Sequence, residues 1–503
     1  MNDGRSLWTA PPSAEQRWAD FEALVRNEQA PFFDGNAPIA GARAPGRLDL
    51  MGGVADYSGS LVLEMPIAEA AYAAWQWRED RQLRIRSLSA AVEGLSPDVS
   101  ISLDELIGTN GEVRPAEEVR KRLSDGSAAQ WAAYVAGCFY VMLAAYSKVA
   151  QGRADIRLGE LGANILITSD VPLGAGLSSS AAIEVATMHA LSEAAGIHPS
   201  DMTLAAWCQR VENTIVGAPC GIMDQVASAL GHEDAVIVLR CQPHDLLGIQ
   251  AIPQGWRFVG IDSRVKHSVG GSHYTNARVG AFMGLKVIQL ESGGKLLENY
   301  LCKMSPEEFA QYRELIPETL TGREYGELYG RLPDTITRAE MDTIYRPRDC
   351  AEHPILENYR VHRFAGLMQV AEMRGQERSL QRDGAVFGTS VEDRHLLEQA
   401  GELMYASHAS YSDRLDLGSP ETDLLVQLVA ERGAKHGLYG AKITGGGAGG
   451  TVAVLADAGS SVAESSLAEL CAEYEGQTGI APRAFVGSSP GAVAFGARQI
   501  LRG

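Results

Sequence analysis

Stretches with strand-like and helix-like spacing of apolar residues follow each other in mixed order along the chain. A short apolar or alternating run between turn residues predicts a strand, whereas apolar residues every three or four positions predict a helix. The predicted strands cover residues 39–63 (broken by turns at 45–46 and 52–53), 83–88, 163–168, 235–239, 257–262, 441–444, 451–455 and 481–486. The predicted helices cover residues 14–27, 128–150, 180–195, 203–213, 276–290, 398–409, 420–435 and 461–475. Because the two kinds of element are interspersed, the pattern favours α+β or α/β layers over a helical bundle or a β-sandwich.

The same pattern divides the chain into regions. Residues 1–35 are expected to form an N-terminal arm with one helix. A boundary near residue 255 is expected to separate a first domain, 36–255, from a second domain, 256–503. Residues from about 295 to 400 are charged and mostly helical in pattern, so we expect a helical insertion within the second domain.

Composition places limits on function. The chain has 503 residues, 45% of them hydrophobic, and its 44 Lys+Arg against 63 Asp+Glu give a net charge of −19. This acidic balance argues against binding to DNA, RNA or anionic membranes, which requires a basic surface. It leaves small anionic ligands open, because a group of backbone N–H donors can bind phosphate inside an acidic protein.

No segment has the pattern of a membrane span or an export signal. The longest apolar stretch, Trp131–Tyr146, is shorter than the roughly 18 residues of a spanning helix, so we expect a buried core helix there. The N-terminus is polar and lacks the apolar region of a signal peptide. The seven cysteines are scattered without metal-ligand spacing, which is typical of reduced thiols. We therefore expect a soluble, cytoplasmic protein with no nucleic-acid or membrane partner.

The strongest local signal is a glycine- and serine-rich loop between a predicted strand and a predicted helix. It consists of Pro172, Leu173, Gly174, Ala175, Gly176, Leu177, Ser178, Ser179, Ser180 and Ala181. Glycines let a backbone approach a ligand closely, and the first N–H groups of a helix attract anions, so the loop indicates phosphate binding. The competing interpretation is an N-capped helix after a flexible turn, because serine is a favoured cap. The loop matches neither a Walker A motif nor a dinucleotide-binding motif.

A second glycine cluster, Thr444–Gly450, lies between two predicted strands and has Gly446 and Gly447 at its centre. On its own it fits a glycine-rich hairpin or a bulge equally well. If the two glycine loops meet in the fold, they would suit one polyphosphate.

Charged residues at tight turns mark two further segments. They are Arg47, Asp49 and Asp56 in residues 44–59, and Glu212 and Asp224 in residues 211–225. Taken singly, charged loop residues are mostly solvated, and an acid in an apolar turn is commonly a helix cap.

Taken together, the four segments resemble the GHMP small-molecule kinases. Their Pro-Gly-Arg, Pro-Leu-Gly-Ala-Gly-Leu-Ser-Ser-Ser-Ala, Pro-Cys-Gly-Ile-Met-Asp-Gln and Thr-Gly-Gly-Gly-Ala-Gly-Gly motifs occur in the order found in that family. Several motifs look most like the galactokinase branch, and residues 47–60 look most like the kinase domain of plant-type L-arabinokinases. The resemblance runs from about residue 39 to 490. It implies an α+β kinase with a ribosomal S5 domain 2-like N-terminal lobe, a ferredoxin-like C-terminal lobe, and a site between the lobes.

The resemblance also implies a reaction and a set of residues. The protein would transfer the γ-phosphoryl group of ATP, with Mg²⁺, to the anomeric hydroxyl of an aldose. Asp224 matches the aspartate that accepts the sugar proton, Arg47 matches the basic residue that keeps this aspartate charged, and Ser180 and Glu212 match magnesium ligands. The ATP-binding positions would be Pro172 to Ala181, Gly446 and Gly447, and the sugar-binding positions would be Gly53, Val54, Asp56, Gly221 and Tyr274.

One departure bears on the sugar. Galactokinases carry Glu-His where this chain has Gly53-Val54, and that pair contacts the C6 hydroxyl. L-Arabinopyranose has the galactose arrangement of ring hydroxyls without a C6 group, and polar groups left facing a missing hydroxyl would be penalised. We therefore predict L-arabinose as the substrate, unless the change at Gly53-Val54 is loop drift without a role in specificity.

The alternatives are a galactokinase or a uronic-acid 1-kinase with the same mechanism, and an inactive sugar/ATP sensor on the same fold. A uronate would call for a basic residue near the C6 position, and residues 52–56 contain none. Retention of Arg47, Asp224, Ser180 and Glu212 argues against an inactive sensor. The sequence carries no signal for the oligomeric state.

Overall fold

A mixed sheet forms the basis of the first lobe. The computed structural model describes residues 10–35, 37–124, 130–147, 158–266, 272–294, 300–381 and 391–501. Within these residues the sheet has eight strands in the order β14-β1-β2-β5-β3-β4, with β6 paired to β2 and β7 to β6, and only the β3–β5 pair is parallel. The strands are β1 (Ile39–Met51), β2 (Leu61–Arg78), β3 (Gln82–Ser87), β4 (Asp98–Ser102), β5 (Gly162–Ser169), β6 (Ala235–Arg240), β7 (Asp245–Ala251) and β14 (Arg498–Ile500).

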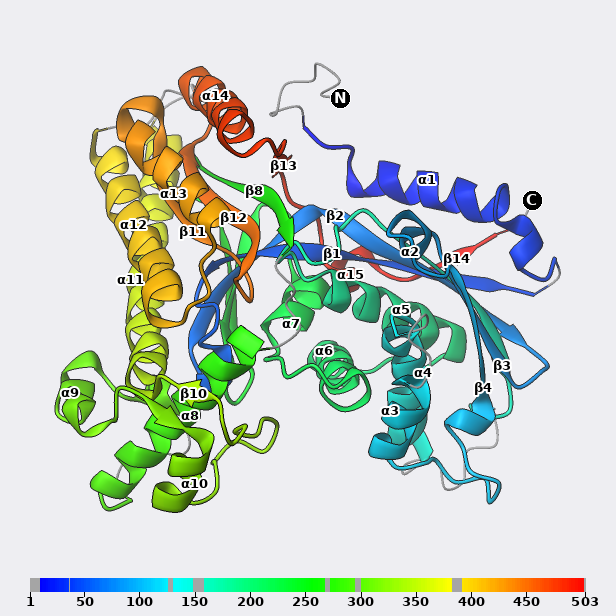
Figure 1. Cartoon of the computed structure of the whole chain (residues 1–503). Coiled ribbons are helices and arrows are strands. Elements are labelled where there is room, and N and C mark those ends of the chain that lie inside the picture. The colour runs from blue at the N-terminus through cyan, green and yellow to red at the C-terminus, as the bar shows by residue number, and fades with distance from the viewer. Residues whose placement is uncertain are drawn as a thin grey trace.

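Helices cover both faces of this sheet (Figure 1). One face carries α3 (Ala116–Ser124), α4 (Ala132–Ser147), α5 (Ser179–Ala195), α6 (Asp201–Arg210) and α7 (Met223–Leu230), and the other face carries α1 (Ala14–Arg26). Along β2, Ala71, Ala73 and Trp75 belong to the core that contains α4 and α5. The intervening Tyr72 packs with Trp18 of α1. A strand covered on both faces is apolar throughout, so it shows no alternation of apolar and polar residues. For this reason β2, which ends at Arg78, extends well beyond the predicted strand that ends at residue 63.

The second lobe contains an antiparallel sheet with the strand order β11-β12-β8-β13. Its strands are β8 (Trp256–Lys266), β11 (Leu438–Ile443), β12 (Gly449–Asp457) and β13 (Arg483–Phe485). Helices α13 (Pro420–Arg432) and α14 (Ser461–Thr478) pack on one face, where Val452 and Val454 point. Helices α11 (Pro347–Gln381) and α12 (Val391–Ala409) pack on the other face, against Ala453 and Leu455.

The predicted insertion is helical in the residues that the structure describes there; residues 295–299 and 382–390 lie outside them. It contains α9 (Pro306–Ala310), α10 (Gly322–Tyr329), the short strands β9 (Leu320–Thr321) and β10 (Ile344–Tyr345), and the long helix α11. Helix α11 lies along α8 (Ser272–Glu291), with Ile355 of α11 and Ala281 of α8 in one apolar cluster. The insertion is thus joined to the core of the second lobe.

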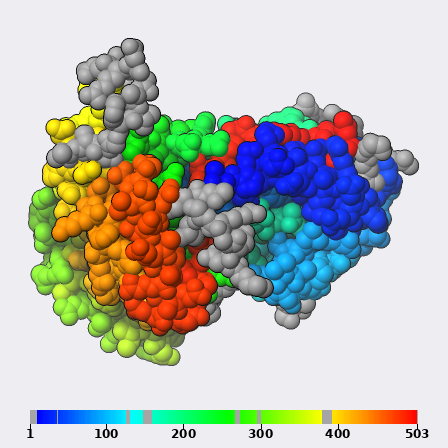
Figure 2. Space-filling view, turned by 90° about the horizontal axis from the view of Figure 1, so that it is seen from above, coloured from blue at the N-terminus to red at the C-terminus, as the bar shows by residue number. Residues whose placement is uncertain are grey.

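The two ends of the described chain lie together on the first lobe. Ile500 of β14 pairs with Ile39 of β1, and Arg498 forms an ion pair with Glu15 of α1 at 2.7 Å. Figure 2 shows red C-terminal residues in both halves of the molecule, beside the orange helices and beside the blue helix α1. The chain leaves the first sheet after β7 and returns to it at β14. The domain boundary near residue 255 stays a prediction. Residues 1–9 of the predicted arm lie outside the described residues.

The mixed layers confirm an α+β fold, and most predicted elements are present. The predicted helix over 203–213 needs correction, because α6 ends at Arg210 and the chain continues as a π-helical turn, Val211–Val216. Among the described residues, no helix is both long and apolar enough to cross a membrane.

Candidate active site

The two glycine-rich loops lie against each other between the lobes. The Thr451 hydroxyl donates a hydrogen bond of 2.7 Å to the carbonyl oxygen of Ala175. A Cβ atom on Gly176 would lie 2.9 Å from the Thr444 carbonyl oxygen, and one on Gly450 would lie 2.8 Å from the Ala175 backbone. The backbones therefore approach too closely for side chains, which explains glycine at these positions.

A cavity of about 430 Å³ opens beside this contact. The predicted ATP-binding residues that line it are Leu173, Gly174, Gly176, Leu177, Ser178, Ser179, Ser180, Gly446 and Gly447. Pro172, Ala175 and Ala181 belong to the same loop and helix start but do not line the cavity. Its other end is largely apolar, with Leu95, Trp131, Ile167 and Ile183.

The helix start at the cavity is not capped by a serine side chain. Ser178 is the N-cap residue of α5, and its backbone is left-handed, with φ of 56°. Its hydroxyl makes no hydrogen bond to the helix and is buried without a partner. The capping interpretation of the serines therefore does not hold for Ser178. Its hydroxyl does not accept a hydrogen bond from the first N–H groups of α5.

Arg47, which is buried, and Asp224, which is partly exposed, both line the cavity and form an ion pair. The guanidinium donates from Nε and Nη2 to Asp224 Oδ1 at 3.0 and 2.7 Å, and from Nη1 to the Gly176 carbonyl at 2.7 Å. Burial disfavours the charge on Arg47, but Asp224 and Glu64 outweigh it and raise its pKa. Arg47 is thus a permanent cation that joins Asp224 to the first glycine loop.

Glu212 and Ser180 lie together at one side of the cavity. Glu212 belongs to the π-helical turn, accepts a hydrogen bond of 2.8 Å from the Gln225 amide, and interacts with the Ser180 hydroxyl. Burial raises the pKa of Glu212 to about 7, and the neighbouring Asp224 adds to the effect. Burial and the nearby Asp224 carboxylate both disfavour the negative charge on Glu212, and a cation would offset this. The Glu212 carboxylate and the Ser180 hydroxyl are oxygen donors of the kind that fits Mg²⁺. The described residues contain no cluster of three or more His, Cys, Asp or Glu side chains suited to a metal ion.

Asp56 and Gly221 are packed against each other next to Asp224. A Cβ atom on Gly221 would collide with the Asp56 carboxylate. Asp56 is buried, its Oδ1 has no hydrogen-bond partner, and burial together with Asp224 raises its pKa to about 6. Tyr274 completes this group; its ring centroid lies 6.1 Å from that of Tyr57 in an edge-to-face arrangement, and its ring lies beside Gly446. The structure therefore brings Asp56, Gly221 and Tyr274 together near Asp224, although none of the three lines the cavity.

Gly53 and Val54 lie deeper, in the turn between β1 and β2. Val54 has a left-handed backbone, with φ of 55°, and its side chain is buried in an apolar cluster. A Cβ atom on Gly53 would collide with the Tyr411 hydroxyl and the Asp49 carboxylate. Neither residue lines the cavity described above.

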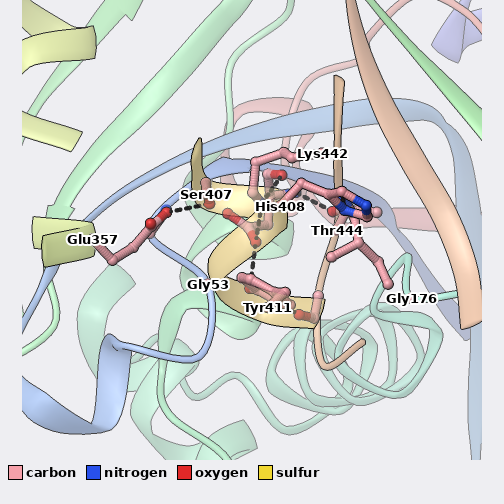
Figure 3. A network of polar contacts seen from close by, with 12 residues as sticks. Gly53, Gly176, Glu357, Ser407, His408, Tyr411, Lys442 and Thr444 are labelled. Atoms are coloured by element: carbon pink, nitrogen blue, oxygen red, sulfur yellow. Dashed lines mark hydrogen bonds and ion pairs between the residues drawn. The ribbon is translucent and has the colours of Figure 1, made fainter. Parts of the chain in front are cut away.

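Sequence reasoning missed the residues that fill the space behind Gly53. Lys442 donates to Asp49 Oδ2 at 2.9 Å, and both side chains are fully buried. Tyr411 donates to Asp49 Oδ2 at 3.4 Å and to the Gly445 carbonyl at 3.2 Å. Figure 3 shows Tyr411 beside Gly53, with Lys442 close by. The only local signal is a lysine between apolar residues of a predicted strand, at Ala441–Ile443.

Comparisons with known proteins agree with this arrangement. Residues 133–232 match the GHMP kinases N terminal domain, residues 30–76 the galactokinase galactose-binding signature, and residues 393–475 the GHMP kinases C terminal domain. The chain is 37% identical to the L-arabinokinase of Arabidopsis thaliana over 94% of its own length, but it spans only 48% of that relative. It is 30% identical to the galactokinase of Chloroflexus aggregans, over 88% of this chain and 90% of the relative.

A solved structure has the same fold. The crystal structure of Lactococcus lactis galactokinase complexed with galactose matches 95% of this chain and 99% of its own, with a TM-score of 0.69 and 21% identity. The expected two-lobed kinase fold is therefore confirmed, and the chain belongs to the GHMP kinase family, in its galactokinase branch.

Proposed function

We propose that this protein is an ATP-dependent sugar 1-kinase that converts L-arabinose to L-arabinose 1-phosphate. The observation that carries the proposal is the Arg47–Asp224 ion pair, 2.7 Å long, in a cavity lined by both glycine loops. The pair supplies a fixed carboxylate, and the loops supply backbone donors for phosphates. The small-molecule partners are then a sugar and ATP.

In this mechanism Asp224 accepts the proton of the anomeric hydroxyl while the hydroxyl oxygen attacks the γ-phosphorus of ATP. The bond from that phosphorus to the β,γ-bridging oxygen breaks, and ADP leaves. Arg47 places a permanent positive charge beside the Asp224 carboxylate and donates to its Oδ1 at 2.7 Å. Arg47 also bonds to the Gly176 carbonyl, so the base and the phosphate loop are held in a fixed relation. Most of the acceleration would come from this positioning and from charge stabilisation.

Ser180 and Glu212 are the residues proposed to hold Mg²⁺, because their oxygens line the cavity beside the helix start of α5. A bound magnesium ion would neutralise charge on the nucleotide phosphates. The apolar end of the cavity, with Leu95, Trp131 and Ile183, has the chemistry to take the nucleobase.

The choice of L-arabinose is supported by the packing at Gly53. The position at which galactokinases carry glutamate has no room for a side chain here, because Tyr411 and Asp49 occupy it. The site therefore offers no acid at residue 53 to a C6 hydroxyl, which suits a sugar without C6. The 37% identity to a protein named L-arabinokinase supports the same choice. The match of residues 30–76 to a galactose-binding signature favours D-galactose as the second candidate.

A panel of aldoses tests both proposals. The purified protein is incubated with ATP and Mg²⁺ and with L-arabinose, D-galactose or D-galacturonate, and ADP release is measured. We expect the highest kcat/KM with L-arabinose and a 1-phosphate product in phosphorus NMR. A higher kcat/KM for D-galactose or D-galacturonate would reject the pentose assignment. If none of the three sugars leads to ADP release, the kinase assignment is rejected.

A further inference from the structure

The turn between β1 and β2, residues 52–60, is held by side chains of the insertion helix α11. The Gly52 N–H donates to Glu357 Oε1 at 3.0 Å, and the Leu61 N–H, just after the turn, donates to Asn358 Oδ1 at 2.9 Å. His353 Nε2 lies 3.1 Å from the Gly53 carbonyl oxygen. Three side chains of one helix in the second lobe thus satisfy three backbone groups of the first lobe.

The spacing of these residues explains how one helix reaches all three groups. His353 and Glu357 are four positions apart and share one face of α11, and Asn358, the next residue, lies about 100° further around the helix. The Cys302 thiol donates to the Pro354 carbonyl at 3.2 Å, which joins α11 to residues 301–303 of the preceding segment. The face that α11 turns toward the β1–β2 turn is therefore polar and buried, unlike the apolar face that packs on α8.

The turn needs this support because its backbone is strained. Val54 is β-branched and adopts φ of 55°, a conformation that such residues rarely adopt. Strained positions persist where the surroundings hold them, and they gather at functional sites. The hydrogen bonds of the Gly52 N–H to Glu357 and of the Gly53 carbonyl to His353 hold the backbone that leads into Val54.

The chemistry of His353 is settled by its partners. A carbonyl oxygen accepts only, so Nε2 carries the proton and donates to Gly53, while Nδ1 accepts from the Ser410 hydroxyl at 2.8 Å. The ring is fully buried, and burial lowers the pKa of His353 to about 4. His353 is a neutral donor at the pH of any cell.

Glu357 has the opposite character, a buried carboxylate that stays charged. Burial opposes its ionisation, but the cations Arg360, at 2.7 Å, and Lys442 outweigh it and lower the pKa of Glu357 to about 2. The Ser407 hydroxyl also donates to its Oε1 at 2.7 Å, as Figure 3 shows. A carboxylate is the stronger type of acceptor for the Gly52 N–H.

We propose that α11 positions the β1–β2 turn for sugar recognition, with His353 and Glu357 as positioning residues. The proposal rests on the proposed function, because Asp56 of this turn is the assigned sugar contact. The nucleotide cavity is lined, within the described residues, by other elements than α11. Loosening the helix–turn contact should therefore weaken sugar binding and leave nucleotide binding unchanged.

Two substitutions at His353 and one control test this. H353L removes the donor to Gly53, H353Q keeps an N–H at a similar reach, and H362L makes the same change at an exposed position of α11. We expect H353L to raise the KM for the best aldose about tenfold, in line with a lost buried hydrogen bond, and to leave the KM for ATP unchanged. H353Q should recover most of the loss, and H362L should match the parent protein. A folded H353L with the parent's sugar KM, or with an equal rise in both KM values, would overturn the proposal.

Hydrogen exchange makes the test independent of activity. Peptides that cover residues 52–61 should exchange faster in H353L than in H362L, whichever aldose is turned over. If the parent protein phosphorylates no aldose, the proposed function fails, and the exchange data still decide whether α11 holds the turn. If H353L does not fold, E357Q takes its place, because it removes the charge and keeps the shape. Unchanged exchange of the turn in a folded E357Q, together with the parent's sugar KM, would count against the proposal.

Discussion

Both hydrogen bonds that Arg47 donates to Asp224 end on one carboxylate oxygen, Oδ1, at 3.0 Å from Nε and 2.7 Å from Nη2. In the proposed mechanism, the second oxygen, Oδ2, would accept the substrate proton. The Asp224 side chain is 22% exposed and that of Arg47 3%, so Asp224 is the more accessible of these two cavity-lining residues. Arg47 thus holds Oδ1 in place, and Oδ2 is the oxygen that the proposed mechanism uses as the proton acceptor.

The first prediction concerns the proposed role of Asp224 as the proton acceptor. D224N keeps the shape of the side chain and removes its basicity, so we expect kcat to fall by about 10²- to 10⁴-fold. The KM for the sugar should change little, because the amide still fills the same space. Steady-state kinetics with L-arabinose and ATP measure both values. Substitution of the exposed Asp20 by Asn provides the matched control, and a D224N enzyme with parental kcat would remove Asp224 from the role of base.

Asp56 leads to a prediction about stability and pH. Burial and Asp224 raise its pKa from 3.8 to about 6, so the folded protein holds a proton that the unfolded chain releases at lower pH. The stabilisation from the protonated group is present below about pH 4 and is lost as pH rises through about 6. D56N cannot lose a proton, so its stability relative to the parent should increase by on the order of 2 kcal/mol between these pH values.

Urea unfolding of the parent and D56N at several pH values between 4 and 7 provides the measurement. The difference between the two proteins isolates Asp56 from the other carboxyl groups that titrate in this range. A constant difference across the range would mean that the pKa of Asp56 is the same in the folded and unfolded states.

A local signal was enough to predict the first glycine-rich loop, whereas the roles of Arg47, Asp224 and Glu212 came from the resemblance to GHMP kinases and stay predictions. Glycine and serine at a helix start predict a phosphate loop, and α5 begins at Ser179, one residue from the predicted start. The helix that carries Asp224, α7, was not predicted, because its eight residues follow a bend and give too short a pattern.

The contacts that complete the site could not be predicted in the same way. Lys442 and Asp49 are 393 positions apart, and His353 lies 300 positions from Gly53. A buried lysine gives no sign in a single sequence of which acid it pairs with. Pairing of this kind depends on how the two lobes meet, which no local pattern contains.

The buried pair of Lys442 and Asp49 leads to a third prediction. Both side chains are fully buried, so removing one partner leaves an uncompensated charge. We expect K442M to lower the free energy of unfolding by roughly 3–5 kcal/mol, and D49N combined with K442M to recover part of that loss. Chemical denaturation of the two single variants and the double variant gives the coupling energy. Simple additivity of the two losses would show that the pair is not coupled.

The last prediction concerns the space behind Gly53. A methyl group there would collide with the Tyr411 hydroxyl and the Asp49 carboxylate, so G53A should displace the turn that carries Asp56. We expect the KM for L-arabinose to rise about tenfold or more, because overpacking shifts the backbone, while the KM for ATP stays near that of the parent. Y411F removes one of the two obstructing groups, so G53A/Y411F should recover part of the sugar affinity even though the hydrogen bonds of Tyr411 to Asp49 and Gly445 are lost. Y411F alone is the control for those two bonds. If G53A binds L-arabinose as well as the parent does, the space behind Gly53 is not rigid, and the packing argument for a pentose loses its physical basis.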